Sequence, residues 1–249
     1  MNYADIHIHA LWGVDDGAKD VSQTHAMVDA CYEDGVRVLC LTPHYHPGYF
    51  GENSESTQQA FQALVLHTQR KYPDLQLFLG NELHYSPESV TWLTEGKCRS
   101  MNGSDYVLVD FSTRETLRNI SKGLDRLLNA GYIPILAHAE RYENLTKQAV
   151  SEFSAKGIWI QVDTRSLFGD FGFSTKHRAK SLLRSRLADL VSSDAHNLTD
   201  RPTGISAAYR LIERKFSKDY ADAVCYNNAL WLLTQQREEG MVSNHESNQ

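Results

Sequence analysis

The chain has 249 residues, of which 41% are hydrophobic and 22% are charged, a composition typical of a soluble globular protein. Its formal net charge of −6 argues against a nucleic-acid partner, because such partners usually require a basic face. No apolar run approaches the roughly 18 residues that a membrane span requires, and the first residues lack the regions of a signal peptide, so we expect a cytoplasmic protein without membrane insertion.

Short apolar runs alternate along the chain with helical patterns. Asp20 and Gln23 fit a capping box for a first helix, which Gly35 is expected to end. Ser112 and Glu115 are expected to cap a later helix. The seven predicted strands cover residues 3–9, 36–42, 75–82, 105–111, 133–138, 158–163 and 187–193.

This alternation predicts a parallel α/β fold. Both an open doubly wound sheet and a barrel are compatible with it. No repeat, Pro-rich linker or low-complexity block marks a domain boundary, so we expect one domain over residues 1–236. The segment 237–249 is polar and is predicted to be a disordered tail.

Side chains that can bind a metal stand at or just after the ends of six predicted strands. In chain order they are His7 and His9, His44, Glu82, Asp110, His138, and Asp194 with His196. Ligands in parallel α/β folds bind at the carboxyl ends of the strands, so these side chains are expected to converge on one mouth. His7 and His9 lie two residues apart on a strand and therefore project from the same face.

An isolated histidine at a strand end is more often a hydrogen-bonded structural residue than a metal ligand, and H-x-H alone is a weak pattern. The joint occurrence of such residues at the same end of many strands is what favours a metal cluster, because buried polar groups need partners. Mixed imidazole and carboxylate ligation suits Mn²⁺, Fe²⁺ or Zn²⁺ rather than Ca²⁺. The number of donors exceeds the coordination number of one ion, and a carboxylate such as Glu82 can bridge two.

One motif points to a different chemistry and is rejected. Cys31 stands before Arg37 in the C-x5-R spacing of cysteine-based tyrosine phosphatases. That site requires a strand, then a loop that opens onto a helix N-terminus, whereas here a helix end leads into a strand. We therefore interpret Cys31 as a buried residue on a helix face.

The series D-x-H-x-H, G-x-D-D-G, TPHY, GNE, AHAER and SDAH resembles the PHP (polymerase and histidinol phosphatase) superfamily. It is most similar to the manganese-dependent tyrosine-protein phosphatases of bacterial capsule and exopolysaccharide operons, the CpsB/YwqE type. The resemblance covers roughly residues 3 to 205. It implies a distorted TIM-like (β/α)7 barrel with up to three metal ions at the carboxyl-end mouth of the strands, and it is this resemblance that favours a barrel over an open sheet.

The resemblance also implies ligand sets, residue by residue. The first ion would be held by His7, His9, Glu82 and Asp194, the second by Glu82, Asp110 and His138, and the third by Asp16, His44 and His196. Arg141 and Arg201 match the family's phosphate-binding arginines. One departure is that the position of Asp110 is usually a glutamate, so the second ion is expected to bind more weakly or through water.

The implied function is hydrolysis of phosphotyrosine by a metal-bound hydroxide, with Mn²⁺ as the cofactor and Fe²⁺, Zn²⁺ or Mg²⁺ as alternatives. The implied substrate is the tyrosine-rich tail of a bacterial tyrosine autokinase that governs capsule or exopolysaccharide synthesis and export. Three other functions remain open: a small-molecule phosphatase of the histidinol-phosphate type, another metal-dependent hydrolase, and a degenerate barrel that acts as a scaffold.

Overall fold

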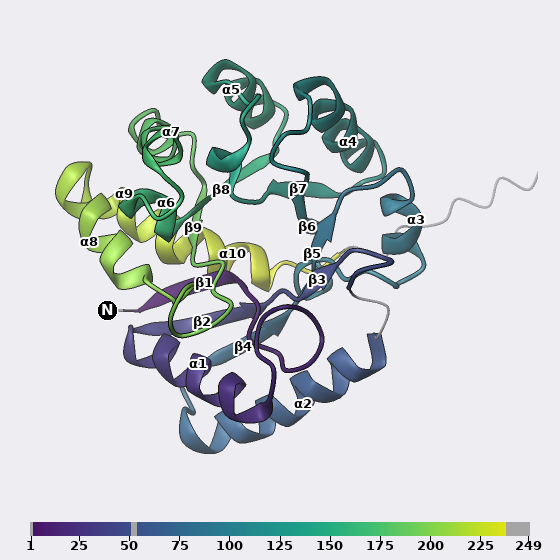
Figure 1. Ribbon diagram of the computed structural model, residues 1–249, viewed down its shortest axis with the longest axis vertical. Coiled ribbons are helices and arrows are strands. Elements are labelled where there is room, and N and C mark those ends of the chain that lie inside the picture. The colour runs from purple at the N-terminus through teal and green to yellow at the C-terminus, as the bar shows by residue number, and fades with distance from the viewer. Residues whose placement is uncertain (1, 51–53, 238–249) are drawn as a thin grey trace, which may run out of the picture.

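Figure 1 shows the computed structural model of the protein, which describes residues 2–50 and 54–237. Nearly all of the predicted tail, residues 238–249, lies outside the described residues. The strands are β1 (Tyr3–Ile8), β2 (Val36–Leu41), β3 (His44–Tyr45), β4 (Gln76–Leu79), β5 (Glu82–His84), β6 (Tyr106–Asp110), β7 (Ile133–Leu136), β8 (Trp159–Asp163) and β9 (Leu190–Ser192).

All pairings between these strands are parallel, in the orders β1-β2-β4 and β3-β5-β6-β7-β8-β9. The two sheets are joined, because β3 continues β2 and β5 continues β4 after breaks of two residues. The curl brings the last strand back to the first: the Asp194 amide donates to the His7 carbonyl at 2.8 Å, and the His9 amide donates to the Ala195 carbonyl at 2.9 Å. The expected distorted (β/α)7 barrel is confirmed.

The predicted strand 36–42 agrees with β2, but the short strand β3 after it was not predicted, and the predicted strand 75–82 is interrupted. Pro43 separates β2 from β3, and a proline has no amide proton to give to a sheet. Gly80 separates β4 from β5 at a point where a Cβ atom would lie 2.9 Å from the Met101 sulfur. A larger residue at this position would therefore displace the buried Met101 side chain, which favours glycine here.

Most of the helices lie around the outside of the curled strands, whereas α10 crosses one end of the barrel (Figure 1). The helices are α1 (Val21–Glu33), α2 (Ser54–Lys71), α3 (Ser89–Thr94), α4 (Leu117–Asn129), α5 (Lys147–Ala155), α6 (Thr164–Phe168), α7 (Phe173–Arg184), α8 (Ile205–Lys215), α9 (Lys218–Asp222) and α10 (Asn228–Thr234). Among the described residues, none of these helices combines the length and apolarity needed to cross a membrane.

The predicted cap of the first helix is confirmed, and that of the later helix is wrong. The Asp20 carboxylate accepts the Gln23 amide proton at 2.8 Å and so begins α1. Ser112 and Glu115 instead form a turn, in which the Glu115 amide donates to the Ser112 carbonyl. Helix α4 begins at Leu117, and its cap, four residues after Ser112, is Thr116, whose hydroxyl accepts the Asn119 amide proton.

The end of the barrel opposite the strands' carboxyl ends is filled by apolar side chains. Helix α10 contributes Ala229, Leu232 and Leu233 to a cluster that includes Ala4 and Val38 of β1 and β2. The remaining buried apolar residues form a larger core cluster with the outer helices. Because one end of the barrel is filled, the polar residues gather at the other end.

Candidate metal centre

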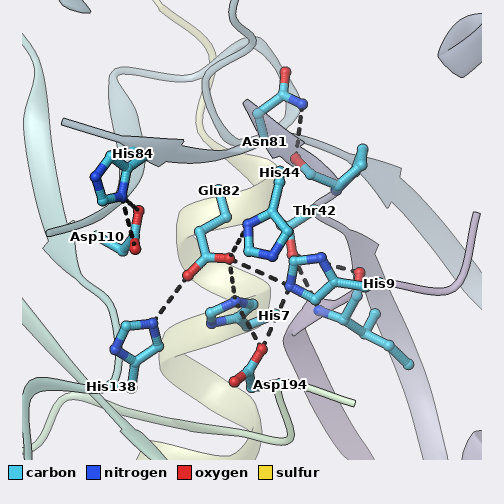
Figure 2. Close-up of polar contacts among 12 residues, drawn as sticks. His7, His9, Thr42, His44, Asn81, Glu82, His84, Asp110, His138 and Asp194 are labelled. Atoms are coloured by element: carbon cyan, nitrogen blue, oxygen red, sulfur yellow. Dashed lines mark hydrogen bonds and ion pairs between the residues drawn. The ribbon is translucent and has the colours of Figure 1, made fainter. Parts of the chain in front are cut away.

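The candidate site lies where the carboxyl ends of the strands converge, and Glu82 stands at its centre (Figure 2). Glu82 begins β5 and is 1% exposed. The structure brings the nine predicted metal-binding side chains into three groups of donor atoms, in which the atoms of each group lie within 4.8 Å of one another.

The first group comprises His7, His9, Glu82 and Asp194, all of them buried. The Nε2 atoms of His7 and His9 lie 3.2 and 3.3 Å from one Glu82 oxygen. Both also lie 3.4 Å from one Asp194 oxygen. The pairing of β1 with β2 shifts register between Asp5 and Ile8, a device that re-aims side chains next to functional sites.

The second group comprises Glu82, Asp110 and His138. His138 places Nε2 3.0 Å from the other Glu82 oxygen, so the two oxygens of Glu82 face different groups (Figure 2). Asp110 lies at the end of β6 and pairs with the His84 ring at 3.0 Å. The His84 ring thereby orients the carboxylate of Asp110, the residue at the position where the resembled family usually has a glutamate.

The third group comprises Asp16, His44 and His196, and the structure adds His9 to it. One Asp16 oxygen lies 3.2 Å from His44 Nε2 and 3.3 Å from His196 Nε2. Asp16 is the most exposed of these residues, with 47% of its side chain accessible. This group therefore forms the solvent-facing side of the cluster.

Several donor atoms lack hydrogen-bond partners among the described residues, and their spacing is that expected around a bound metal ion. His7 Nε2, His9 Nε2, His196 Nε2 and Glu82 Oε2 are buried and have no hydrogen-bond partner. Donor atoms around an ion bound at about 2.1 Å lie roughly 3.0 to 3.4 Å apart, which is the spacing found here. Burial lowers the pKa of His44, but Glu82 and Asp16 outweigh it and raise that pKa to about 9, so ion binding would release a proton from this ring.

Two supporting side chains were missed by the sequence analysis. The Nδ1 atom of His9 lies 2.7 Å from the Asp15 carboxylate, which also accepts the amide protons of Gly17 and His44. Gln161 accepts the His138 amide proton at 2.7 Å and lies 3.3 Å from the His7 ring. Such partners orient ligand rings. Asp15 lies in the G-x-D-D-G motif, where only Asp16 was singled out, and nothing in its local sequence marks Gln161.

Arg141 and Arg201 both reach this centre. Each donates to the same Asp194 oxygen at 2.7 Å. Arg141 also donates to Asp163, a fully buried residue that the sequence analysis did not single out. Burial raises the pKa of Asp163 to about 7, although Arg141 opposes the shift. Both guanidinium groups therefore lie next to the first donor group, on the side of Asp194.

Two of the predicted ligands have left-handed backbone conformations, His138 with φ 34° and Asp194 with φ 52°. Such conformations cost about 1 to 3 kcal/mol each for residues other than glycine and are concentrated at functional sites. At both positions the chain leaves a strand and turns at once, so the side chain points back over the end of the barrel.

The cysteine motif has no reactive thiol. Cys31 is 1% exposed on α1, and burial raises the pKa of its thiol well above the ordinary value. Arg37 pairs with Asp74 at 2.9 Å. The interpretation of Cys31 as a core residue is therefore confirmed.

Comparison with known proteins identifies the family. Residues 3–234 match the family described as capsular polysaccharide synthesis, CpsB/CapC. The chain belongs to this family. The tyrosine-protein phosphatase CpsB of Streptococcus agalactiae serotype III is 30% identical over 236 residues, which cover 92% of this chain and 97% of that protein. The tyrosine-protein phosphatase YwqE of Bacillus subtilis is 28% identical over 233 residues, 93% of this chain and 92% of YwqE.

Solved structures agree with the family assignment. One from a study of YwqE of Bacillus subtilis and CpsB of Streptococcus pneumoniae, described as unique metal-dependent tyrosine phosphatases, superimposes with a TM-score of 0.85 at 29% identity and 95% coverage of both chains. Histidinol phosphate phosphatase from Lactococcus lactis has a TM-score of 0.57 at 14% identity, with 86% of this chain and 94% of that chain covered. The second likeness concerns the fold alone.

Proposed function

We propose that this CpsB/CapC family protein is a metal-dependent protein-tyrosine phosphatase, with the nine donor residues as its metal ligands. The observation that carries the proposal is the set of three donor groups, which share Glu82 and His9. Two arginines donate hydrogen bonds to Asp194 of the first group. Family membership and the likeness to metal-dependent tyrosine phosphatases support it.

The protein's own residues have distinct roles in this proposal. Glu82 presents one oxygen to the first and third groups and the other to the second, so its carboxylate sets the spacing between them. Bound ions would supply positive charge and a strongly polarised water at neutral pH. Asp15 and Gln161 hold the rings of His9 and His7 in the orientations that ligation needs.

Arg141 and Arg201 are assigned to phosphate binding. Their planar guanidinium groups match phosphate geometry. Both form ion pairs with Asp194, which belongs to the first donor group. Arg201 is 29% exposed and so is accessible to an incoming phosphoryl group, whereas Arg141 is 14% exposed and is held by Asp163. We propose that Arg141 is a fixed phosphate-binding group and that Arg201 contacts the incoming phosphoryl group at the mouth of the site.

The finer assignments belong to the same proposal. Mn²⁺ is the proposed ion, because mixed imidazole and carboxylate donors suit it, with Fe²⁺, Zn²⁺ and Mg²⁺ as alternatives. The proposed substrate is a phosphotyrosine protein of capsule or exopolysaccharide synthesis, in particular the tyrosine-rich tail of a bacterial tyrosine autokinase. The catalytic domain would cover residues 1–236.

Metal removal tests this proposal. The protein stripped of metal should not hydrolyse a phosphotyrosyl peptide, and addition of Mn²⁺ should restore hydrolysis. His7→Ala should lose at least about a hundred-fold in kcat/KM with Mn²⁺ present, because a buried ligand of the first group is missing. Thiol alkylation should have no effect, since every one of the four cysteines is buried.

The outcomes separate the alternatives. Turnover of small phosphate esters without turnover of the peptide would assign the protein to small-molecule phosphatases. Absence of hydrolysis of any phosphate ester by the Mn²⁺-loaded protein would contradict the proposal.

A further inference from the structure

A groove leaves the metal centre on the side of the third donor group. It has a volume of about 410 Å³, within the range of roughly 300 to 1,000 Å³ typical of ligand-binding clefts. Asp16 and His196 line its inner end. From there it runs between the first turns of α1 and the loop 197–200. Whatever binds at the third donor group is therefore next to this groove.

Two larger hollows among the described residues do not share this position. One has a volume of about 500 Å³ and is lined by residues such as Leu77 and Tyr132, and the other, of about 550 Å³, lies on α2 beside Leu66. Neither is lined by a residue of the donor groups. Continuity with the metal centre therefore distinguishes the smaller groove.

The groove wall has mixed chemistry. Leu198 is an exposed apolar residue with 48% of its surface accessible, and it lies in the groove with Ala26 of α1. Ser22, Gln23 and Thr199 are exposed and carry hydroxyl or amide groups. Such a wall fits an extended peptide, whose backbone needs hydrogen-bond partners and whose side chains need apolar surface.

The charged residues of the groove wall also favour a peptide. Away from Asp16 at its inner end, the charged residues that line the groove are Lys19 and Asp200, and their opposite signs leave this wall without a basic field. A polyanion or an anionic membrane surface would require a basic wall. A peptide segment of low charge does not.

We propose that this groove binds the polypeptide next to the phosphotyrosine of the substrate, with an apolar side chain against Leu198 and the backbone along Ser22, Gln23 and Thr199. The proposal rests on the proposed phosphatase function and extends it to substrate choice. An extended chain rises about 3.3 Å per residue. With the phosphotyrosine at the metal centre, the residues next to it in the peptide would therefore lie in the adjoining groove. A small aryl phosphate does not extend into it.

Two groove variants test the proposal with the Mn²⁺-loaded full chain. Leu198→Asp puts a charge on the apolar wall, and Ala26→Trp fills the groove. Each is assayed on p-nitrophenyl phosphate and on a phosphotyrosyl peptide with apolar residues on both sides of the phosphotyrosine. The ratio of the two kcat/KM values, peptide over aryl phosphate, should fall about ten-fold in each variant, through a higher KM for the peptide.

Matched controls carry the same changes on α2, away from the metal centre. Leu66 is 62% exposed and Ala63 is also exposed, and both line a different surface hollow. Leu66→Asp and Ala63→Trp should keep the wild-type ratio. Thermal melting of all four variants shows whether each is folded, and Leu198→Asp, at an exposed loop position, keeps the test valid if Ala26→Trp is unstable.

The failures are distinguishable. If the wild-type protein hydrolyses both substrates and the ratio stays unchanged in the groove variants, or falls equally in the controls, the peptide groove is wrong and the phosphatase proposal stands. If the wild-type protein hydrolyses neither substrate, the phosphatase proposal fails and the groove assignment fails with it.

Discussion

At the scale of single residues, the orientation of each histidine ring matters as much as its presence. His9 reaches the cluster through Nε2 because Asp15 occupies Nδ1 at 2.7 Å. Burial alone would raise the pKa of Asp15, but the His9 ring outweighs it and lowers that pKa, so the residue acts as a fixed anion. The pair sets the tautomer that a metal ligand needs.

The Asp15→Asn variant tests this role. The amide keeps the size of the side chain and an acceptor oxygen but removes the charge, so the His9 ring is held less firmly. We expect Mn²⁺ affinity to fall about ten-fold or more. Isothermal titration of the metal-free protein measures it, and Asp20→Asn, which changes an exposed capping residue outside the cluster, serves as the control. Equal affinities in the Asp15→Asn variant and the wild type would contradict the assignment.

The sequence analysis predicted the donors but not their supports. His7, His9 and His138 stand at strand ends, where a topology rule alone predicts convergence. Asp163 supports Arg141 from a different segment of the chain, and Asp15, although only six residues from His9, meets its ring through the fold of the loop that follows β1. No spacing rule connects a carboxylate to a ring or guanidinium group that reaches it through tertiary structure.

At the scale of elements, the loop 13–18 between β1 and α1 shapes the mouth. It folds back on β1, with the Ala18 amide donating to the His9 carbonyl at 3.1 Å. A Cβ atom at Gly17 would lie 1.9 Å from that carbonyl oxygen, so only glycine allows the approach. The loop thereby places Asp15 and Asp16 beside the histidines.

Gly17→Ala should therefore destabilise the protein, by about 2 to 4 kcal/mol, because backbone atoms on both sides of the clash must move. Gly13→Ala in the same loop is the matched comparison. Its Cβ would meet nothing within 4 Å, so only its φ of 69° costs free energy, about 1 to 2 kcal/mol. Urea unfolding of the metal-free proteins measures both values. A smaller loss for Gly17→Ala than for Gly13→Ala would show that the loop relaxes freely.

Local signals predicted some elements and missed others. The cap at Asp20 could be predicted because capping is an interaction within one turn. The breaks between β2 and β3 and between β4 and β5 arise where the strands bend at the mouth. The residues that cause them, Pro43 and Gly80, have many other uses in a chain, so their effect depends on the neighbouring segments.

At the scale of the whole molecule, one carboxyl group links stability to pH away from the metal cluster. Asp189 accepts the Ile160 amide proton at 2.8 Å in a largely buried position. Burial raises the pKa of Asp189 to about 6, although that hydrogen bond opposes the shift. The folded state then binds more protons than the unfolded state, so this group's contribution to stability falls as pH rises from about 4 to 6.

The Asp189→Asn variant should lack that loss, since the amide oxygen can still accept the Ile160 proton. Relative to that of the wild type, its free energy of unfolding should therefore increase by about 1 to 2 kcal/mol, toward greater stability, between pH 4 and pH 6. Denaturant unfolding of both metal-free proteins across this range measures the difference. A difference that stays constant with pH would contradict it.

By itself, the sequence determined the α/β alternation, the residues that carry the metal chemistry and the resemblance that favours a barrel. Periodicity reports which faces of each segment are buried, and an open sheet and a barrel bury the same faces. Only the tertiary structure decided that β9 returns to β1, that His9 belongs to the third donor group as well as the first, and that a groove adjoins the third. These features depend on distances between segments far apart in the chain, which no local pattern encodes.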